Sequence, residues 1–422
     1  MNRALARTIL DRMGQTGQPP ARGALEVNVG TQPLLDVLRD EYLVPIRELA
    51  RVSAFKLVQA PFGGGKTHFL HCLREVAWSE GFATALVSVS AQEVPCDDPV
   101  LVFRAVAQRI ELAPGDPLEE GDPGIDALLR LEAERRLREY PADEVLAWLD
   151  RDFARARVDS HAVRRAAQLL MQGVVQGDDG LVRLMSAFLR GEDVKPHEVR
   201  PHDVREELQT STAFRFLRSL VQVARALGLP GVVLLFDEMD RVMALPPKRR
   251  KAVGDTLRQV IDQCGQATLP GLLWVYAVPP EFMSNVVIEY PALEQRLKGV
   301  PRFGHLSPQS PLIDLDHLPL APTELLRGIG LRLLEVYEVA HGISLDPDVQ
   351  RHNVGTLAGE MGRRLLESGA RRDFVKQVVD LVTGQHRGGE RRLSPDEIVR
   401  MTGGAAALNV STLDDDEELF GP

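Results

Sequence analysis

Cysteine is scarce in this sequence, with three residues among 422. Cys72, Cys96 and Cys264 lie far apart, and none of them belongs to a C-x-x-C pair or to a spaced cluster of cysteines and histidines. A structural metal site or a disulfide framework requires such spacing. We therefore expect three buried free thiols.

Long hydrophobic runs are also missing, because no apolar segment reaches the roughly 18 residues that a membrane span needs. The first residues, from Met1 to Leu5, lack the apolar core of a secretory signal. These two absences predict a cytoplasmic protein without a membrane segment.

Neither positive charge nor aromatic residues dominate the composition. Fifty Lys and Arg residues against 60 Asp and Glu residues give a formal net charge of −10, so the chain as a whole is not a polycation that coats nucleic acid. Half of that excess comes from the acidic run 414–418, which we interpret as a solubilising tail, with a docking peptide as the alternative. Aromatic residues make up 5% of the chain, which disfavours a surface that stacks on unpaired bases.

Short apolar runs bounded by turn residues predict strands that are buried on both faces. They are Phe55–Val58, Ala85–Val89, Val232–Phe236, Leu272–Ala277 and Leu312–Leu315. Helical patterns lie between these runs, as at Thr67–Ser79 and Lys251–Cys264, and this alternation is typical of a doubly wound α/β domain. The expected fold class is therefore α/β, with a parallel sheet between layers of helices.

The composition also predicts how the chain is divided. We expect residues 1–112 and 206–320 to form the two parts of the α/β core, and residues 113–205 to form a helical insertion. Residues 321–403 are expected to be a C-terminal helical domain, and residues 404–422 a disordered acidic tail.

Helix signals support the C-terminal helical domain. Amphipathic patterns cover residues 323–341, 360–367 and 373–382. Gly342 stands where a helix would end, and Ser394 stands before Pro395 where a helix would begin.

The strongest motif is an apolar strand that leads through Gly63-Gly64-Gly65-Lys66-Thr67 into a helix. In such a P-loop the glycines let successive backbone N–H groups point at phosphate oxygens, the lysine reaches the β and γ phosphates, and the threonine hydroxyl binds Mg²⁺. The motif predicts binding of ATP with Mg²⁺, and a glycine-rich turn without ligand is the alternative. The candidate nucleotide contacts are Gly63, Gly64, Gly65, Lys66, Thr67 and His68. Ala60 takes the place of the motif's first glycine.

A second motif, GVVLLFDEMD, ends an apolar run in Asp237 and Glu238. In P-loop enzymes an acidic pair at this place holds hydrated Mg²⁺ and orients the attacking water. We assign Asp237, with Thr67, to the metal, and Glu238 to the water; a solvated turn is the alternative. Together the two motifs predict an ATPase in which Lys66 and Glu238 are catalytic.

Arginines after the fourth apolar run and in the C-terminal helical domain are candidates for the γ-phosphate. Arg296, in EYPALEQRLKG, is the candidate arginine finger, which in ring-forming ATPases enters a neighbouring subunit and makes hydrolysis depend on assembly. Arg302 is the second candidate for that role. Arg371 or Arg372 begins an amphipathic helix, and we take Arg372 as the residue that contacts nucleotide. The alternative for each is an ordinary arginine on a helix.

A run of basic residues, Lys248-Arg249-Arg250-Lys251, follows the acidic pair closely. Four adjacent cations can bind DNA phosphates without reading sequence, and such binding is sensitive to salt. A solvated helix start is the alternative interpretation.

Taken together, these motifs resemble the AAA+ class of P-loop ATPases and, within it, the ATP-binding proteins of the bacteriophage-exclusion (BREX) defence systems, of the BrxD type. The resemblance rests on LEVNVGTQPLLDVL, APFGGGKTHFL, VLLFDEMD, AVPPEF followed by YPALEQRL, and GARRDFVKQVVDLV. It extends over about residues 25–382, with the helical insertion the least similar part.

The resemblance implies a RecA-like core followed by a helical lid, with adenine held near Val29 and Gly30 and with ATP between subunits. It also implies a defence setting on DNA. The expected function is an ATP-binding and ATP-hydrolysing protein of an anti-phage system. It would form a homo-oligomer and assemble, with ATP bound, on double-stranded DNA, on other defence subunits or on both. The alternative is a nucleotide-dependent signalling switch that recruits a protein effector without DNA contact.

Overall fold

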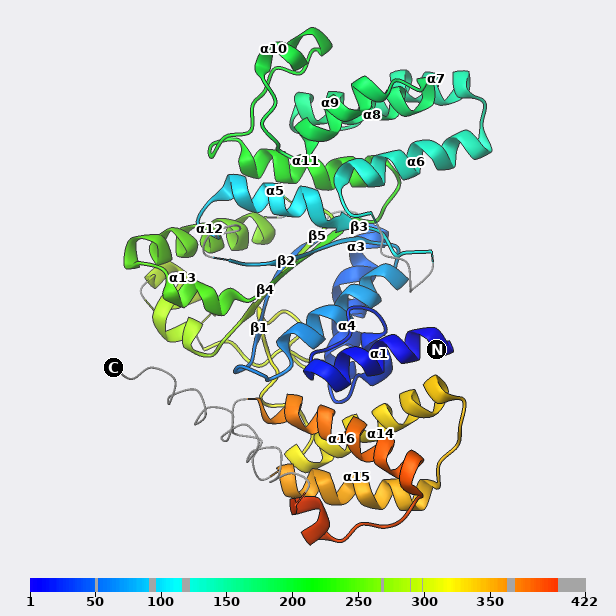
Figure 1. Cartoon of the computed structure of the whole chain (residues 1–422). Helices are drawn as coiled ribbons and strands as arrows, with labels where there is room; N and C mark the ends of the chain where they lie inside the picture. The colour runs from blue at the N-terminus through cyan, green and yellow to red at the C-terminus, as the bar shows by residue number, and fades with distance from the viewer. Residues whose placement is uncertain are drawn as a thin grey trace, which may run out of the picture. The chain divides into compact units, whose positions relative to one another are not determined.

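The computed structural model describes residues 1–49, 52–90, 96–115, 122–266, 269–288, 290–297, 299–362 and 369–400 (Figure 1). The chain forms two compact units, which we describe separately. The first holds Met1–Gln32, Pro61–Cys72 and the chain from Asp316 onward, and the second holds Pro33–Ala60 and Leu73–Leu315.

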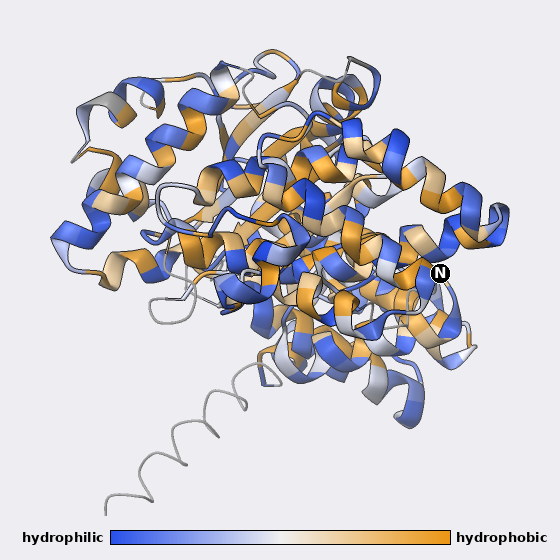
Figure 2. Ribbon diagram, turned by 90° about the horizontal axis from the view of Figure 1, so that it is seen from above, coloured by the Kyte–Doolittle hydropathy of each residue, from blue (hydrophilic) through white to orange (hydrophobic). Residues whose placement is uncertain are grey.

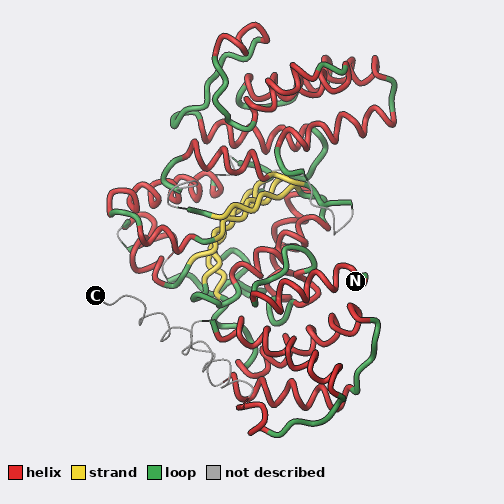
Figure 3. The backbone as a smooth tube through the Cα atoms, viewed as in Figure 1, coloured by secondary structure: helices red, strands yellow, loops and turns green. Residues whose placement is uncertain are grey.

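The second unit is built on a sheet that, in the described residues, has six strands (Figure 3). They are β1 (Ser53–Gln59), β2 (Ala83–Ser88), β3 (Ile110–Glu111), β4 (Val232–Asp237), β5 (Leu272–Val278) and β6 (Leu312–Asp314). Their order is β3-β2-β4-β5-β1-β6, and the pairing of β3 with β2 is antiparallel whereas the other pairings are parallel. β4 and β5 therefore lie between β1 and β2 in the sheet, and the parallel pairings require crossover connections.

This sheet confirms the expected α/β fold class, and each predicted strand is present. Every residue of β4 and β5 is buried, because helices cover both faces of a parallel sheet. At the centre, the ring of Phe236 lies 5.1 Å from that of Trp274 and 4.7 Å from that of Tyr276, measured between ring centroids.

Helices pack on the two faces of the sheet. In Figure 1, α5 (Pro99–Arg109) and α12 (Pro247–Gly265) lie on one face and α3 (Val44–Leu49) on the other. The carboxylate of Asp98 accepts hydrogen bonds from the N–H groups of Val100 and Leu101, which fixes the start of α5. Other helices described in this unit are α2 (Gln32–Leu38), α6 (Ile125–Glu139), α7 (Ala142–Arg151), α8 (His161–Gln176), α9 (Asp179–Leu189), α10 (Pro196–Val199), α11 (Ala213–Ala226) and α13 (Pro291–Leu297).

A lysine lies buried on β1, with 1% of Lys56 exposed. Its ammonium donates hydrogen bonds to the hydroxyl of Tyr42 at 2.7 Å and to the carbonyl of Ser310 at 2.7 Å. Burial lowers the pKa of Lys56 to about 7 and raises the pKa of Tyr42 to about 12. The hydrogen bonds compensate for the loss of water around the charged group.

The first unit is helical and packs α1 (Arg3–Thr16), α14 (Pro322–His341), α15 (Pro347–Gly362) and α16 (Ala370–Gly388) around an apolar core. In Figure 2, hydrophobic and hydrophilic residues alternate along the helices, as expected where one face is buried. Gly342 ends α14 with a φ of 66°, so the predicted helix end is confirmed. Gly330 lets α14 approach its neighbours, because a Cβ there would lie 2.5 Å from Val354.

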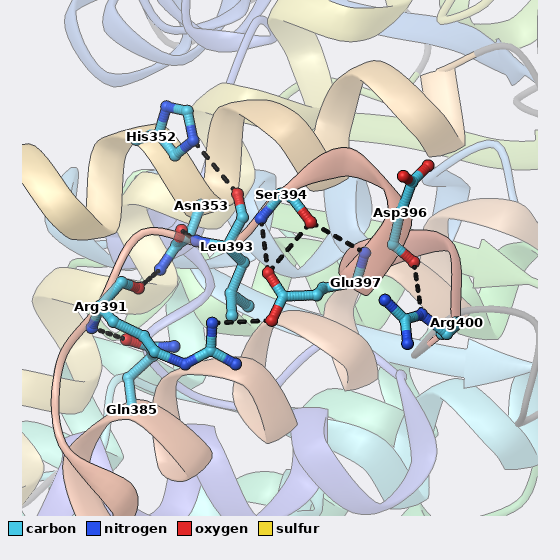
Figure 4. A network of polar contacts seen from close by, with 9 residues as sticks. All are labelled: His352, Asn353, Gln385, Arg391, Leu393, Ser394, Asp396, Glu397 and Arg400. Carbon is cyan, nitrogen blue, oxygen red and sulfur yellow. Dashed lines mark hydrogen bonds and ion pairs between the residues drawn. The ribbon is translucent and has the colours of Figure 1, made fainter.

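The chain after α16 is held against α15 by a network of polar contacts (Figure 4). The buried amide of Asn353 donates to the carbonyl of Arg391 and accepts from the N–H of Leu393. Ser394 and Glu397 form reciprocal side-chain to backbone bonds, which confirms the predicted helix start at Ser394. These bonds, with the Arg391 guanidinium, lower the pKa of Glu397 to about 2.

Three further expectations from the sequence concern membrane segments, the cysteines and the acidic tail. Within the described parts of the chain, no helix is both long and apolar enough to cross a membrane. Cys72, Cys96 and Cys264 are buried and form no disulfide, as expected. The acidic tail predicted at 404–422 lies outside the described residues.

Candidate nucleotide site

The glycine-rich loop leaves the end of β1 and leads into α4 (Lys66–Ser79). Ala60 is buried, and its N–H donates to the carbonyl of Val278 at 3.3 Å, which joins the loop's first residue to β5. Gly63 and Gly65 have φ values of 76° and 94°, a backbone region that residues with a Cβ rarely adopt. The two glycines therefore give the loop the curled backbone that a phosphate-binding loop needs.

The loop lies against the start of α16, within the first unit. The guanidinium of Arg371 donates a hydrogen bond of 2.6 Å from Nη1 to the carbonyl oxygen of Gly64. A Cβ on Gly65 would lie 3.3 Å from the same nitrogen, and a Cβ on Gly63 would lie 3.2 Å from the N atom of Gly369. A side chain on Gly65 would therefore crowd the guanidinium, and a side chain on Gly63 would crowd the backbone before α16.

The neighbouring arginine takes a different position. The guanidinium of Arg372 lies 4.7 Å from the ring centroid of Phe62, a loop side chain that is 57% exposed. This is a cation–π contact. The structure therefore brings Arg371 to the loop backbone and Arg372 to the loop's exposed aromatic ring. The choice of Arg372 as the nucleotide contact stays a prediction.

Two more predicted contacts lie at the start of α4. The ammonium of Lys66 donates to the carbonyl of Pro61 at 3.0 Å, so it is folded over its own loop. Burial and the positive charge of Arg371 lower the pKa of His68 to about 4. The imidazole is therefore neutral at physiological pH, and it contributes hydrogen bonding but no charge near phosphates.

The segment predicted to hold adenine, Val29 and Gly30, packs against the chain that leads into α14. A Cβ on Gly328 would lie 2.7 Å from Val29 Cγ1, and a Cβ on Gly30 would lie 3.0 Å from Leu320 Cδ1. Thr31 donates to the side chain of Asn28 and closes the turn around this segment. The surroundings are apolar, as a flat base requires.

The acidic pair stands at the end of β4, in the second unit. The carboxylate of Asp237, which is 6% exposed, accepts a hydrogen bond of 2.8 Å from the N–H of Glu238. Glu238 has a positive φ of 61°. Among the described residues other than glycine, only Asp203 also has a positive φ. Its carboxylate lies 2.9 Å from the guanidinium of Arg241. A strained residue of this kind is often found at functional sites.

The candidate arginine finger is tied to its own chain. The guanidinium of Arg296, on α13, lies 2.6 Å from the carboxylate of Asp262 on α12. Arg302, the second candidate, is exposed in the loop after α13. Both assignments stay predictions.

The basic run occupies the first turns of α12, which begins at Pro247 and not at the expected Lys251. Arg249 forms a two-pronged ion pair with Asp97, with distances of 2.7 and 2.8 Å. Arg250 donates to the carbonyl of Leu245 at 3.4 Å. Lys248 and Lys251 are exposed. The structure thus separates two exposed lysines from two arginines with partners in the same chain.

The oxygen donors suit a magnesium ion. Thr67 carries its hydroxyl at the second residue of α4, and Asp237 presents a carboxylate at the end of β4. Mg²⁺ prefers one or two protein oxygens together with phosphate oxygens and water. Each of the two side chains is an oxygen donor of the kind that Mg²⁺ prefers, and their joint assignment to the metal stays a prediction.

The chain was compared with protein families, with solved structures and with curated proteins. The model of the BREX system ATP-binding protein BrxC/D family matches residues 1–390. This match confirms the resemblance that the motifs indicate. Among solved structures, the chain is similar to the Aeropyrum pernix ORC2 protein (ADPNP-ADP complexes), with 12% sequence identity, a TM-score of 0.45, and coverage of 89% of this chain and 67% of that chain. A search of curated proteins gives no match.

Proposed function

The chain belongs to the family of BREX system ATP-binding proteins BrxC/D, and we propose that it hydrolyses ATP to ADP and phosphate and uses this cycle to assemble with other subunits and with double-stranded DNA. The observation that carries the proposal is the glycine-rich loop. Two glycines of this loop have a left-handed backbone conformation, and they precede the N-terminus of α4. Backbone N–H groups at the start of a helix are available to phosphate. Arg371, which donates a hydrogen bond to the carbonyl of Gly64, adds a cation beside that loop.

Each motif residue takes one role in this proposal. Lys66 exchanges its bond to Pro61 for the β and γ phosphates when ATP binds. Thr67 and Asp237 would hold Mg²⁺, which would supply positive charge against the phosphates. Glu238 orients the water that attacks the γ-phosphate. In these roles the protein forms no covalent bond to the phosphate, because phosphoryl transfer depends mainly on positioning and electrostatics.

Turnover and binding test this part of the proposal. We expect the wild type to bind ATP and to release phosphate, Lys66→Ala to lose ATP affinity, and Glu238→Gln to bind ATP without turnover. The matched control is Glu335→Gln, an exposed carboxylate on α14 that is paired with Arg332. Unchanged phosphate release in Glu238→Gln would contradict the role of this residue.

Assembly is the second part of the proposal. Arg296 acts on the ATP of a neighbouring copy, and it leaves Asp262 when it does so. Light scattering of Glu238→Gln with ATP is expected to show a homo-oligomer, and Arg296→Ala is expected to lose turnover without losing ATP affinity. A monomer under these conditions would remove the basis for an arginine that acts between copies.

The DNA part rests on the exposed lysines of α12. Lys248 and Lys251 contact phosphates, whereas Arg249 is held by Asp97. Two phosphate contacts correspond to a slope of roughly −1.8 in log K against log salt. We expect Lys248→Ala/Lys251→Ala to weaken duplex binding and to flatten that slope. The control is Lys195→Ala/Arg155→Ala, which removes two positive charges, as the test variant does, at two exposed positions between α7 and α10.

A signalling switch is the second candidate function, and the bond between Arg371 and Gly64 favours it. A helix that contacts the phosphate loop can move when nucleotide arrives, and a moved helix can recruit a protein effector. ATP turnover that is indifferent to duplex DNA, together with a fixed oligomeric state, would support the switch over the DNA-assembled ATPase.

A further inference from the structure

The ion pair between Arg249 and Asp97 joins the basic run of α12 to the chain that precedes α5, within the second unit. Arg249 Nε lies 2.7 Å from Asp97 Oδ2, and Arg249 Nη2 lies 2.8 Å from Asp97 Oδ1. The side chain of Asp97 is 13% exposed and that of Arg249 is 39% exposed. Paired bonds between a guanidinium and a carboxylate are stronger than a single contact. One edge of the guanidinium is therefore engaged within the chain.

The residues on either side of Asp97 are anchored. Cys96 is 1% exposed, and its Sγ donates to the Sδ of the buried Met239 at 3.3 Å. On the other side, the carboxylate of Asp98 caps the N-terminus of α5. Asp97 therefore presents its carboxylate to α12 from a fixed position.

The basic run does not serve the stability of its own helix. Lys248-Arg249-Arg250-Lys251 lies in the first turns of α12, and the first turn contains no acidic residue. Cations at this end of a helix are repelled by the positive end of the helix dipole. An anion from outside the chain therefore explains the run better than helix stability does.

The pair with Asp97 opposes contact between Arg249 and such an anion. A DNA phosphate has to displace a carboxylate that already holds the guanidinium, and the carboxylate itself repels the phosphate. Lys248 and Lys251 are exposed beside this pair. The number of cations that α12 offers to a phosphate backbone thus depends on Asp97.

We propose that Asp97 withholds Arg249 from DNA phosphates and so limits the affinity of α12 for duplex DNA. The inference rests on the proposed function, because it requires Lys248 and Lys251 to contact the duplex. The ligand is the phosphate backbone, without readout of sequence. A site with fewer phosphate contacts binds DNA less tightly and with a weaker dependence on salt.

Removal of the Asp97 charge is expected to add one phosphate contact for each copy bound. In Asp97→Asn the slope of log K against log salt is expected to become more negative by about 0.9. Duplex affinity at low salt is expected to rise on the order of three- to tenfold. The double variant Asp97→Asn/Arg249→Gln removes both partners without a change in net charge, and it is expected to bind like the wild type.

The experiment follows the fluorescence anisotropy of a labelled random-sequence duplex with the full chain and ATP, over a range of salt concentrations. Asp255→Asn is the matched control, because it removes one negative charge from an exposed position on the same helix. Arg249→Lys keeps the net charge but lacks the planar fork that binds a carboxylate through two bonds. It is expected to gain part of the effect of Asp97→Asn. Melting temperatures verify that the variants fold.

Tighter binding and a steeper slope in Asp97→Asn, absent from the double variant and from Asp255→Asn, support the proposal. Equal gains in Asp97→Asn and Asp255→Asn overturn it, because they show a general effect of charge. An unchanged slope in Asp97→Asn also overturns it and leaves the pair as a structural tie. If Asp97→Asn does not fold, Arg249→Lys decides, and a wild-type slope in that variant overturns the proposal.

The same titrations separate this inference from the proposed function. If no variant binds duplex, the DNA part of the proposed function fails and this inference fails with it. If Lys248→Ala/Lys251→Ala weakens binding while Asp97→Asn binds like the wild type, the DNA part stands and this inference alone is wrong.

Discussion

Arg371 and Gly64 are joined by a hydrogen bond of 2.6 Å, from guanidinium to main-chain carbonyl, although 307 positions separate them in the sequence. The bond ties the start of α16 to the phosphate loop. Burial and the charge of the same guanidinium lower the pKa of His68, in the first turn of α4. Of the two adjacent arginines, Arg371 is the one that contacts the loop backbone, and we therefore expect it to lie closer to a bound triphosphate.

Replacement of the two adjacent arginines is expected to have unequal effects. Arg371→Ala removes a charge-assisted hydrogen bond and a cation from the loop, and we expect ATP affinity to fall about tenfold. Arg372→Ala removes a contact to an exposed ring and is expected to change affinity by less than about twofold. Titration with a fluorescent ATP analogue measures both. Equal losses of ATP affinity in the two variants would contradict the expectation that Arg371 is the closer contact.

Glycine is needed at some positions of the phosphate loop and not at others. Ala60 does not adopt a left-handed φ, whereas Gly63 has a φ of 76°. We therefore expect Ala60→Gly to leave ATP affinity unchanged and to lower the free energy of unfolding by about 1 kcal/mol, because glycine is more flexible when unfolded. Gly63→Ala is expected to abolish ATP binding. Calorimetric titration of both variants tests this contrast.

The buried lysine of β1 predicts a pH dependence of stability. Lys56 has a pKa of about 7 in the folded chain against an ordinary value of 10.5, so between these values the unfolded chain binds more protons. The free energy of unfolding therefore rises with pH across this window and is flat below it for this group. Tyr42 stays protonated there, since its pKa is about 12.

The variant Lys56→Met isolates this contribution. Denaturant unfolding across the window is expected to give a difference between wild type and variant that grows with pH. Parallel pH curves for the two proteins would show that Lys56 does not titrate in this range.

A buried amide holds the chain after α16. Asn353 is 0% exposed and bonds to the backbone of Arg391 and Leu393, so Asn353→Leu would leave a buried N–H and a carbonyl without partners. We expect a loss of about 2–3 kcal/mol in the free energy of unfolding. Arg351→Leu, an exposed change on the same helix, is the control. Faster proteolysis near Leu393 in the Asn353 variant alone is the second readout.

Strands and helices could be predicted where the pattern is long. The buried run of β4 has six apolar or acidic residues between turn signals, and such runs identify central strands. β3 could not be predicted, because Ile110 and Glu111 form no periodic pattern. α12 begins at Pro247, earlier than the expected Lys251, and a proline at the first helical position is common.

The candidate site was predictable in its motifs and not in its pairings. Gly63 to Thr67 and Asp237-Glu238 are recognisable because the residues proposed to bind phosphate and metal are contiguous in each motif. The partner of Arg249 is Asp97, 152 positions away, and no local pattern indicates it. Likewise, the phase of α16 decides that Arg371 and not Arg372 reaches Gly64, and a one-residue difference in phase lies below the accuracy of an amphipathic pattern.

The burial of all three thiols makes the protein convenient for chemical labelling. Cys72, Cys96 and Cys264 are covered by side chains, and burial raises the pKa of Cys264 to about 12, so little reactive thiolate forms at neutral pH. A single cysteine introduced at an exposed site would carry a dye or a spin label without removal of the native ones. Label pairs on α12 and on α16 would then report whether nucleotide changes the distance between these two helices in the otherwise unmodified chain.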